Sequence, residues 1–452
     1  MTDLDLERLG AQAQILIEAS AAPETEVSIT SEVDNFVRFG DRGPTQCADR
    51  ERVSVSIRAR VQIPGGGYSE ASVEVTGRDP QEWHRALGRA HELAKVSPVN
   101  ERALPLGGEV QVPEVYGDGA TMAHPASAKA EWVKAALSAT EPEQQNPAGM
   151  AQTSGRGRVI VNSMGRAVQA SCSSASFSLT ATGLTGSGVG KSLCARVEDL
   201  DVERAIKRAV DKSRRAQKPR ALAPGEYPVV LEPLAVCSAL MQASYRGFGA
   251  REYEEGESFL CGRVGERAFA PELSITDNAM IPVAPGLPFD GEGNPRQITP
   301  LVQTGVLQSP VTDVRFAKSL GLPCSGHGAS QPSADGPMAE NLVVSSGECD
   351  LGELLRRIDR GLLITQFHYT NAIDFRELLL TGMTRNGTFW VEDGEIQYAV
   401  KNLRFTDSLV RAFAEVRGVG TSREVVGDLI EGVCVTPAIA LPNFRFTSVT
   451  DA

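Results

Sequence analysis

A glycine-rich stretch, Gly183–Ser192, carries the residue types of a phosphate-binding loop. In such a loop, backbone amides and a lysine hold nucleotide phosphates while a serine or threonine binds magnesium. The glycine that the motif requires five residues before Gly190 is Thr185 here, and the preceding Ser176–Thr182 alternates polar and apolar residues. A phosphate loop instead follows a continuously apolar parallel strand. We therefore interpret the stretch as a glycine-rich surface turn and expect no nucleotide binding.

The run Asp290–Asn294 resembles the opening of a calcium loop, in which carboxylates at alternate positions bind the ion. Such a loop needs glycine at its sixth position and glutamate at its twelfth. Pro295 and Leu301 stand at those two positions. The sequence therefore excludes a calcium site of this kind.

The spacing of histidine and cysteine argues against a local metal or nucleophile site. None of the five histidines forms an H-x-x-x-H pair, and the eight cysteines include no C-x-x-C pair. Such pairs would mark zinc sites, thioredoxin-like sites or related redox motifs. The G-x-S-x-G motif of serine hydrolases is also missing, and we interpret Ser325–Gly328 as a glycine-rich turn. We expect most of the cysteines to be reduced thiols in the core.

Composition bounds both the fold and the function. The chain has 452 residues and a net charge of -12. It is long enough for two domains, and it lacks the basic balance typical of nucleic-acid binding. No segment is apolar over the length of a bilayer span, and the first residues lack the pattern of a signal peptide. We therefore expect a cytoplasmic protein that binds neither nucleic acid nor membrane.

Residue patterns in the first half predict mixed α and β structure. Two alternating segments flank the turn residues 64–67, which is typical of an antiparallel hairpin. The predicted elements are helices over 4–19, 80–93, 128–137 and 200–216, and strands over 53–63, 71–75, 159–161 and 177–181. We predict an N-terminal mixed α/β domain with an antiparallel sheet over residues 1–220.

The second half is punctuated by glycine and proline and predicts short strands. They lie at 301–307, 362–367, 389–391 and 396–400. A helix is expected over 351–358 with Asp350 as its N-cap, and the prolines of 218–225 mark a linker. The prediction is therefore an α+β protein whose C-terminal domain, residues 225–452, is β-rich and barrel-like with inserted helices.

Several segments of the second half resemble, in order and spacing, the TldD/PmbA family of peptidases (peptidase U62). The first is Gly225–Pro233, which is similar to the strand by which that family enters its C-terminal domain. The others are 256–260, 289–295, 304–307, 317–321, 361–365 and 391–396. Together they span most of residues 225–450, whereas the first half resembles the family more weakly.

The catalytic TldD-type members carry H-E-x-x-x-H on the next helix, where two imidazoles bind zinc and the glutamate is the general base. Met241, Gln242 and Arg246 stand at these positions, and residues 234–255 contain no histidine. A thioether is a weak ligand, an amide takes no proton from water, and a guanidinium repels a divalent cation. We therefore predict no zinc site. Cys434, near the region where catalytic members supply a thiolate, is expected to be a buried structural cysteine.

The resemblance implies that this chain is a TldE/PmbA-like, non-catalytic subunit of a heteromeric zinc metallopeptidase. A TldD-type partner would supply the zinc, with no cofactor in this chain. The heterodimer would cleave or trim small or unfolded peptides, or peptide-like natural-product precursors. The alternative is a stand-alone binding or scaffold homodimer that has lost proteolysis.

His368, Tyr369 and Asn371 are the candidate substrate-binding residues. They follow an apolar strand, in a segment where the resemblance implies a substrate-facing strand and loop. An extended peptide needs hydrogen-bond partners along a groove, and these side chains can supply them. The alternative is a histidine that is hydrogen-bonded at the end of a strand without a function.

Overall fold

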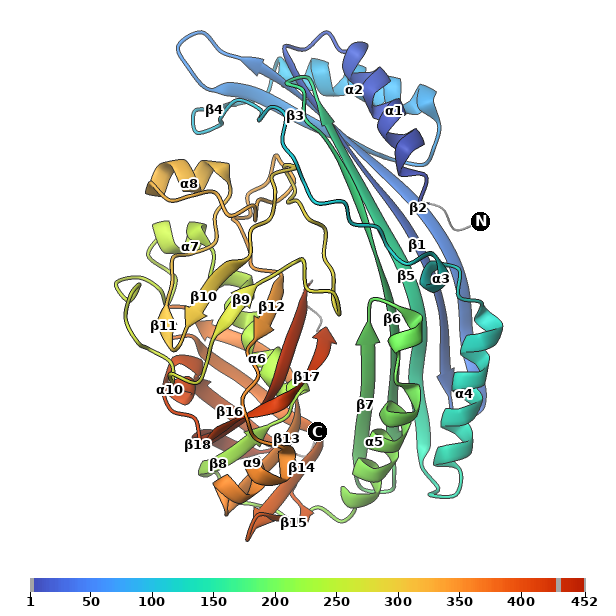
Figure 1. The fold of residues 1–452 in the computed structure, drawn as a ribbon, viewed down its shortest axis with the longest axis vertical. Helices are drawn as coiled ribbons and strands as arrows, with labels where there is room; N and C mark the ends of the chain where they lie inside the picture. The colour runs from blue at the N-terminus through green and yellow to red at the C-terminus, as the bar shows by residue number, and fades with distance from the viewer. Residues whose placement is uncertain (1–3, 428–431, 451–452) are drawn as a thin grey trace.

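The computed structural model describes residues 4–427 and 432–450 and contains two sheets that lie side by side (Figure 1). The first sheet has the order β4-β3-β2-β1-β5-β6-β7, and every neighbouring pair is antiparallel. Its strands are β1 (Glu24–Gly40), β2 (Gly43–Gln62), β3 (Tyr68–Thr76), β4 (Val99–Asn100), β5 (Asn146–Asn162), β6 (Ala167–Thr182) and β7 (Ser187–Cys194). The antiparallel sheet predicted for the first half is confirmed.

Long hairpins build this sheet. The predicted hairpin is β2 with β3, and Gly65, Gly66 and Gly67 turn the chain at positive φ, where glycine is unstrained. The central strand β1 was not predicted from the sequence. Its apolar face is interrupted by Ser31 and Asn35, which weakens the alternating pattern.

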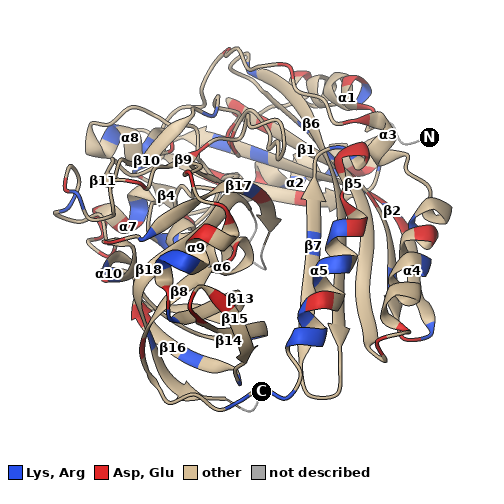
Figure 2. Cartoon of the chain, turned by 60° about the horizontal axis from the view of Figure 1, so that its bottom comes forward, with Lys and Arg blue, Asp and Glu red and all other residues tan. Residues whose placement is uncertain are grey.

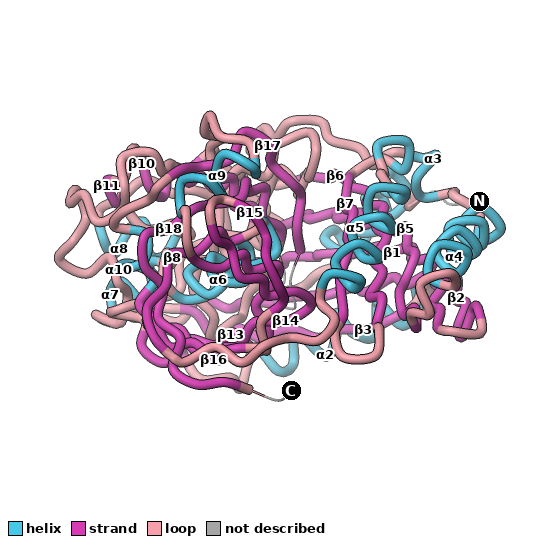
Figure 3. The backbone as a smooth tube through the Cα atoms, turned by 90° about the horizontal axis from the view of Figure 1, so that it is seen from below, coloured by secondary structure: helices cyan, strands magenta, loops and turns pink. Residues whose placement is uncertain are grey.

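Helices cover one face of the first sheet. They are α1 (Leu6–Glu18), α2 (Pro80–Ala94), α3 (Gly119–Met122), α4 (Ala126–Thr140), the short η1 (Val197–Asp199) and α5 (Val202–Arg215). Odd-numbered residues of β1, such as Val27 and Ile29, are buried with α1 and α2. The opposite face of β5 is turned to the second sheet, where Ile160 packs with Phe289. Seen from below, α5 lies where the two parts meet (Figure 3).

The glycine-rich stretch is mostly a strand, so its prediction as a surface turn was wrong. Residues 183–186 turn the chain, and β7 then runs antiparallel to β6. A Cβ added at Gly190 would lie 1.8 Å from the carbonyl oxygen of Ala205 in α5. At Gly188 it would lie 2.3 Å from the carbonyl oxygen of Ala209. The glycines therefore let the helix and the strand approach closely.

The second sheet has the order β11-β10-β9-β12-β18-β16-β14-β13-β8, with β15 on β14 and β17 on β18. Because β8 also pairs with β18, the strands β18, β16, β14, β13 and β8 close into a ring. The strands are β8 (Gly225–Leu231), β9 (Ile275–Asp277), β10 (Thr299–Gln303), β11 (Val306–Leu307), β12 (Asn341–Val344), β13 (Gly361–Asp374), β14 (Leu379–Glu392), β15 (Glu395–Ala399), β16 (Leu403–Ser408), β17 (Gly418–Gly427) and β18 (Val433–Val449). The β-rich, barrel-like second half and the α+β class are confirmed.

Helices are inserted among these strands. They are α6 (Pro233–Arg246), α7 (Ala250–Glu254), α8 (Val314–Leu320), α9 (Leu351–Ile358) and α10 (Leu409–Phe413). Helix α9 has the predicted bounds, and the Asp350 side chain accepts a hydrogen bond from the backbone N–H of Glu353. Throughout the described residues, no helix is both long enough and apolar enough to cross a bilayer.

An ion cluster joins α5 to the second sheet. Arg208 donates to Glu424 of β17 at 2.7 Å and to Glu232 at 3.3 Å, and Lys212 also contacts Glu232. Burial works to raise the pKa of the Glu232 carboxyl, but Lys212 and Arg208 outweigh it and lower that pKa. Figure 2 shows the alternating basic and acidic bands along α5. The chain passes from one sheet to the other just after α5, and the division into domains 1–220 and 225–452 stays a prediction.

Candidate functional site

A cleft of about 890 Å³ lies between the first sheet and the second part of the chain. Arg156 and Arg158 of β5 and Cys172 of β6 line one wall. The other wall comes from the end of α6, from α7, from segments between residues 285 and 341 and from residues 432–433. Volumes of this order are typical of ligand-binding clefts. The cleft is therefore our candidate functional site.

Helix α6 places its C-terminal end at this cleft. Residues 233–241 are all buried, which is typical of a helix inside a core. In the last turn, Tyr245 is exposed and Arg246 is half-buried, and both line the cleft. The helix on which the resemblance places the zinc motif therefore leads from the core to the candidate site.

The first motif position, Met241, belongs to the core. Its side chain has no exposed surface, and a Cβ added at Gly432 would lie 2.8 Å from its Cε. Cys434 of β18 is buried in the same hydrophobic cluster. Gln242 is half-buried. Within the residues that the structure describes, no group of three or more His, Cys, Asp and Glu is arranged to hold a metal ion. These residues do not fit zinc.

Arg246, the last motif position, is held by carboxylates and an aromatic ring. Its Nη2 donates to Glu257 Oε2 at 3.0 Å, and its Nε lies 3.5 Å from Glu252 Oε1. The guanidinium carbon is 5.2 Å from the centroid of the Phe375 ring, in the turn after β13. A fixed positive charge thus stands at the cleft end of α6.

His327 belongs to a closed polar cluster in the cleft wall, so the interpretation of residues 325–328 as only a turn was incomplete. Its Nδ1 is 2.9 Å from Ser325 Oγ, and its Nε2 lies 3.1 Å from Asp277 Oδ1. Burial works to raise the pKa of Asp277, but Arg296, at 3.0 Å, outweighs it and lowers that pKa. The serine is buried and accepts the backbone N–H of Thr312. The serine therefore cannot act as a nucleophile on a bound ligand.

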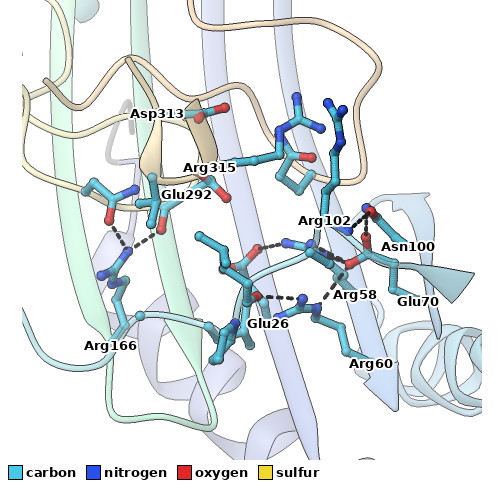
Figure 4. A pocket seen from close by; sticks show the side chains of 18 residues that line it. Glu26, Arg58, Arg60, Glu70, Asn100, Arg102, Arg166, Glu292, Asp313 and Arg315 are labelled. Atoms are coloured by element: carbon cyan, nitrogen blue, oxygen red, sulfur yellow. Dashed lines mark hydrogen bonds and ion pairs between the residues drawn. The ribbon is translucent and has the colours of Figure 1, made fainter. Parts of the chain in front are cut away.

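A second cavity of about 90 Å³ is lined by charged side chains of the first sheet, among them Arg58, Arg60 and Glu70 (Figure 4). Arg60 Nε donates to Glu70 Oε2 at 3.0 Å on neighbouring strands. Arg166 donates to the backbone oxygen of Glu292 at 2.6 Å and to Asn294 Oδ1 at 2.8 Å. The two Arg166 contacts hold the loop that carries residues 290–296 against the first sheet.

Glu292 has the most perturbed carboxyl of this loop. Burial and the nearby carboxylates of Asp290 and Asp313 raise its pKa to about 8. A Cβ added at Gly328 would lie 2.8 Å from Glu292 Oε2 and 3.0 Å from Asp290 Oδ2, so both carboxyls approach the same point. Glu292 therefore holds a proton at neutral pH and can donate a hydrogen bond.

The structure brings His368, Tyr369 and Asn371 together on β13. The rings of His368 and Tyr369 are 4.2 Å apart between centroids, and Asn371 Nδ2 donates to the backbone oxygen of Tyr369 at 3.0 Å. Tyr369 is 68% exposed and has a φ of 49° at a register shift. None of the three lines either cavity, although the same strand leads to Phe375 beside Arg246. Their substrate-binding role stays a prediction.

Comparison with known proteins supports the resemblance of the second half. Residues 224–448 match the PmbA/TldA metallopeptidase C-terminal domain. The chain is 25% identical over 272 residues to a metalloprotease of Methanothermobacter thermautotrophicus, covering 58% of this chain and 59% of that protein. It is 28% identical over 194 residues to a PmbA homolog of Haemophilus influenzae, covering 42% and 40%. The chain thus spans about half the length of the curated relatives it matches.

The fold of the whole chain is similar to that of TldE from Thermococcus kodakarensis. The TM-score is 0.84 at 19% identity, covering 98% of this chain and 100% of that chain. At this identity the likeness shows the fold alone. The two sheets and the matched domain define an α+β protein with a C-terminal domain of metallopeptidase type. Residues 224–448 of the chain belong to the PmbA/TldD family.

Proposed function

We propose that this chain is a TldE/PmbA-like, non-catalytic subunit of a heteromeric zinc metallopeptidase in the cytoplasm. It binds a peptide, or a peptide-like natural-product precursor, and a TldD-type partner supplies the zinc that cleaves it. One observation carries the proposal. Helix α6 ends at the cleft as a metal-bearing helix would, but Met241, Gln242 and Arg246 occupy the motif positions.

The chemistry of these residues supports a binding role without hydrolysis. Met241 is enclosed in the core, so it cannot reach a ligand in the cleft. The Gln242 amide cannot act as a general base, and the Arg246 guanidinium repels a divalent cation. A cleft of about 890 Å³ with polar groups on both walls is suited to an extended peptide.

Purification under native conditions tests the partnership. We expect a tagged copy of the chain, expressed in its own cells, to co-purify with a protein that carries H-E-x-x-x-H. The complex should contain zinc and hydrolyse peptides. Recovery of a homodimer with no such protein would refute the proposal and favour the stand-alone binding or scaffold protein.

Metal analysis of the isolated chain is the second test. After dialysis, mass spectrometry should find no stoichiometric zinc, and the chain alone should hydrolyse no peptide. The matched control is Arg246→His with Gln242→Glu, which should create no activity because Met241 and a third ligand are still unsupplied. One tightly held zinc per wild-type chain would overturn the reasoning.

A further inference from the structure

Arg156 and Arg158 stand side by side on the inner face of β5. They are two residues apart in a strand, so their side chains leave the same face about 7 Å apart, and both line the cleft. Arg158 donates to the hydroxyl groups of Ser28 and Ser330 and to the backbone oxygen of Gly291. Burial lowers the pKa of the Arg158 guanidinium, and Arg156 lowers it further. Over the described residues, no carboxylate forms an ion pair with Arg158. Arg156 Nε lies 3.5 Å from Glu32 Oε1, but both side chains are exposed, so water screens this pair.

The opposite wall carries Arg246 and Arg251. Besides its contact with Glu252, Arg246 pairs with Glu257, which is 56% exposed, and Arg251 pairs with Glu255, which is 43% exposed. Exposed ion pairs are weak because water screens them. A guanidinium has five N–H donors, so each arginine keeps donors for a ligand.

The acidic residues of the cleft are largely engaged already. Asp290 accepts backbone N–H groups from three residues, and Glu340 binds Arg296 at 2.6 Å. Glu252 lies beside the arginine at the end of α6. Asp335 is the fourth acidic side chain of the lining. Among the described residues that line the cleft, five arginines therefore face four acidic residues, in a chain whose net charge is -12.

We propose that the cleft selects peptides by their carboxylates, which Arg156 and Arg158 bind together from β5. Paired guanidiniums bind the two oxygens of a carboxylate with defined geometry, and an anion between them would relieve their mutual repulsion. This inference rests on the proposed function, because it takes the cleft as the peptide-binding site. It adds that the substrates are acidic peptides. The net charge of -12 disfavours the binding of such peptides outside the cleft.

Fluorescence anisotropy with the full-length chain tests this selectivity. The assay compares four labelled peptides of about ten residues. Three of them alternate alanine with glutamate, glutamine or lysine and are amidated at the C-terminus. The fourth has the glutamine sequence with a free C-terminal carboxylate. At low salt, the glutamate peptide should bind at least about tenfold more tightly than the amidated glutamine peptide, and salt should weaken it. Tight binding of the free-terminus peptide would instead assign the site to the terminal carboxylate, which also supports carboxylate selection.

Two variants place the selectivity on β5. Arg156→Gln and Arg158→Gln should each weaken binding of the preferred carboxylate peptide about tenfold. Arg156 is 51% exposed, so its replacement leaves the fold intact, and thermal unfolding checks both variants. Arg52→Gln, on the exposed part of β2, makes the same charge change outside the cleft and should leave binding unchanged.

Three results would overturn the inference. They are equal affinity for the amidated glutamine peptide and both carboxylate peptides, full affinity in a folded Arg156→Gln variant, and tighter binding of a single-stranded oligonucleotide than of any peptide. None of these measurements depends on the zinc-bearing partner. A failed selectivity test therefore leaves the co-purification result standing, and the two proposals can fail separately.

Discussion

Replacing Glu292 by glutamine should remove much of the pH dependence of stability between about pH 5 and 8. The carboxyl has a pKa of about 8 in the folded chain, against an ordinary value of 4.5. Because the folded chain keeps a proton that the unfolded chain releases, this contribution is fully present below pH 4.5 and is lost as the pH rises through 8. Linkage gives roughly 2.5 kcal/mol between about pH 5 and 7. Partial exposure of the side chain reduces this to about 1–2 kcal/mol.

Denaturant unfolding at several pH values, followed by tryptophan fluorescence, measures this contribution. The wild-type free energy of unfolding should decrease from about pH 5 to 7. The decrease should be smaller by about 1–2 kcal/mol in the Glu292→Gln variant. Glu114→Gln, at an exposed site on a connecting segment, is the matched control and should follow the wild type. Equal pH slopes for the wild type and Glu292→Gln would refute the assignment of a buried, protonated carboxyl.

Three further changes test the packing and the remaining site prediction. Gly190→Ala should lower the free energy of unfolding by about 1–3 kcal/mol in denaturant titrations, since its Cβ would strike a backbone oxygen of α5, and unchanged stability would contradict that packing. Glu232→Gln leaves Lys212 buried without its anion and should cost about 3–5 kcal/mol in the same assay; a loss below about 1 kcal/mol would count against the ion cluster. His368→Ala with Asn371→Ala should lower kcat/KM of the partnered complex by roughly one to two orders of magnitude at an unchanged elution volume. Full activity would make His368 a structural histidine.

Local chemistry explains which elements the sequence could predict. The α9 helix was placed correctly because an aspartate cap and an apolar face lie within one short segment. Strand β1 was missed because Ser31 and Asn35 lie on its buried face. Asn35 accepts a hydrogen bond at 2.8 Å from the buried Lys129 of α4, which is distant in the sequence. When the hydrogen-bond partner of a buried polar residue is distant in the sequence, the residue looks like a break in the alternating pattern of the strand.

In the candidate site, too, local features could be predicted from the sequence, whereas features assembled by the fold could not. The three positions at which the family resemblance places a zinc motif could be compared directly, because they lie within six consecutive residues of α6. The cleft was not visible, because its walls come from β5 and β6, from segments between residues 245 and 341, and from residues 432–433. His327 meets Asp277 only through the fold. The spacing of Arg156 and Arg158, at the period of a strand, was the one local signal available for the opposite wall.

The proposed loss of the zinc motif need not abolish recognition, because hydrolysis and anchoring use different groups. Hydrolysis needs a metal-bound water and a base, and Met241 and Gln242 provide neither. Anchoring of a carboxylate needs positive charge, which Arg246 keeps at the end of α6 and Arg158 supplies from β5. A chelator should therefore stop peptide cleavage by the partnered complex, while binding of acidic peptides to this chain, measured by anisotropy, stays within about twofold. If the chelator abolished that binding, the cleft would depend on a metal, and the separation of recognition from catalysis would be wrong.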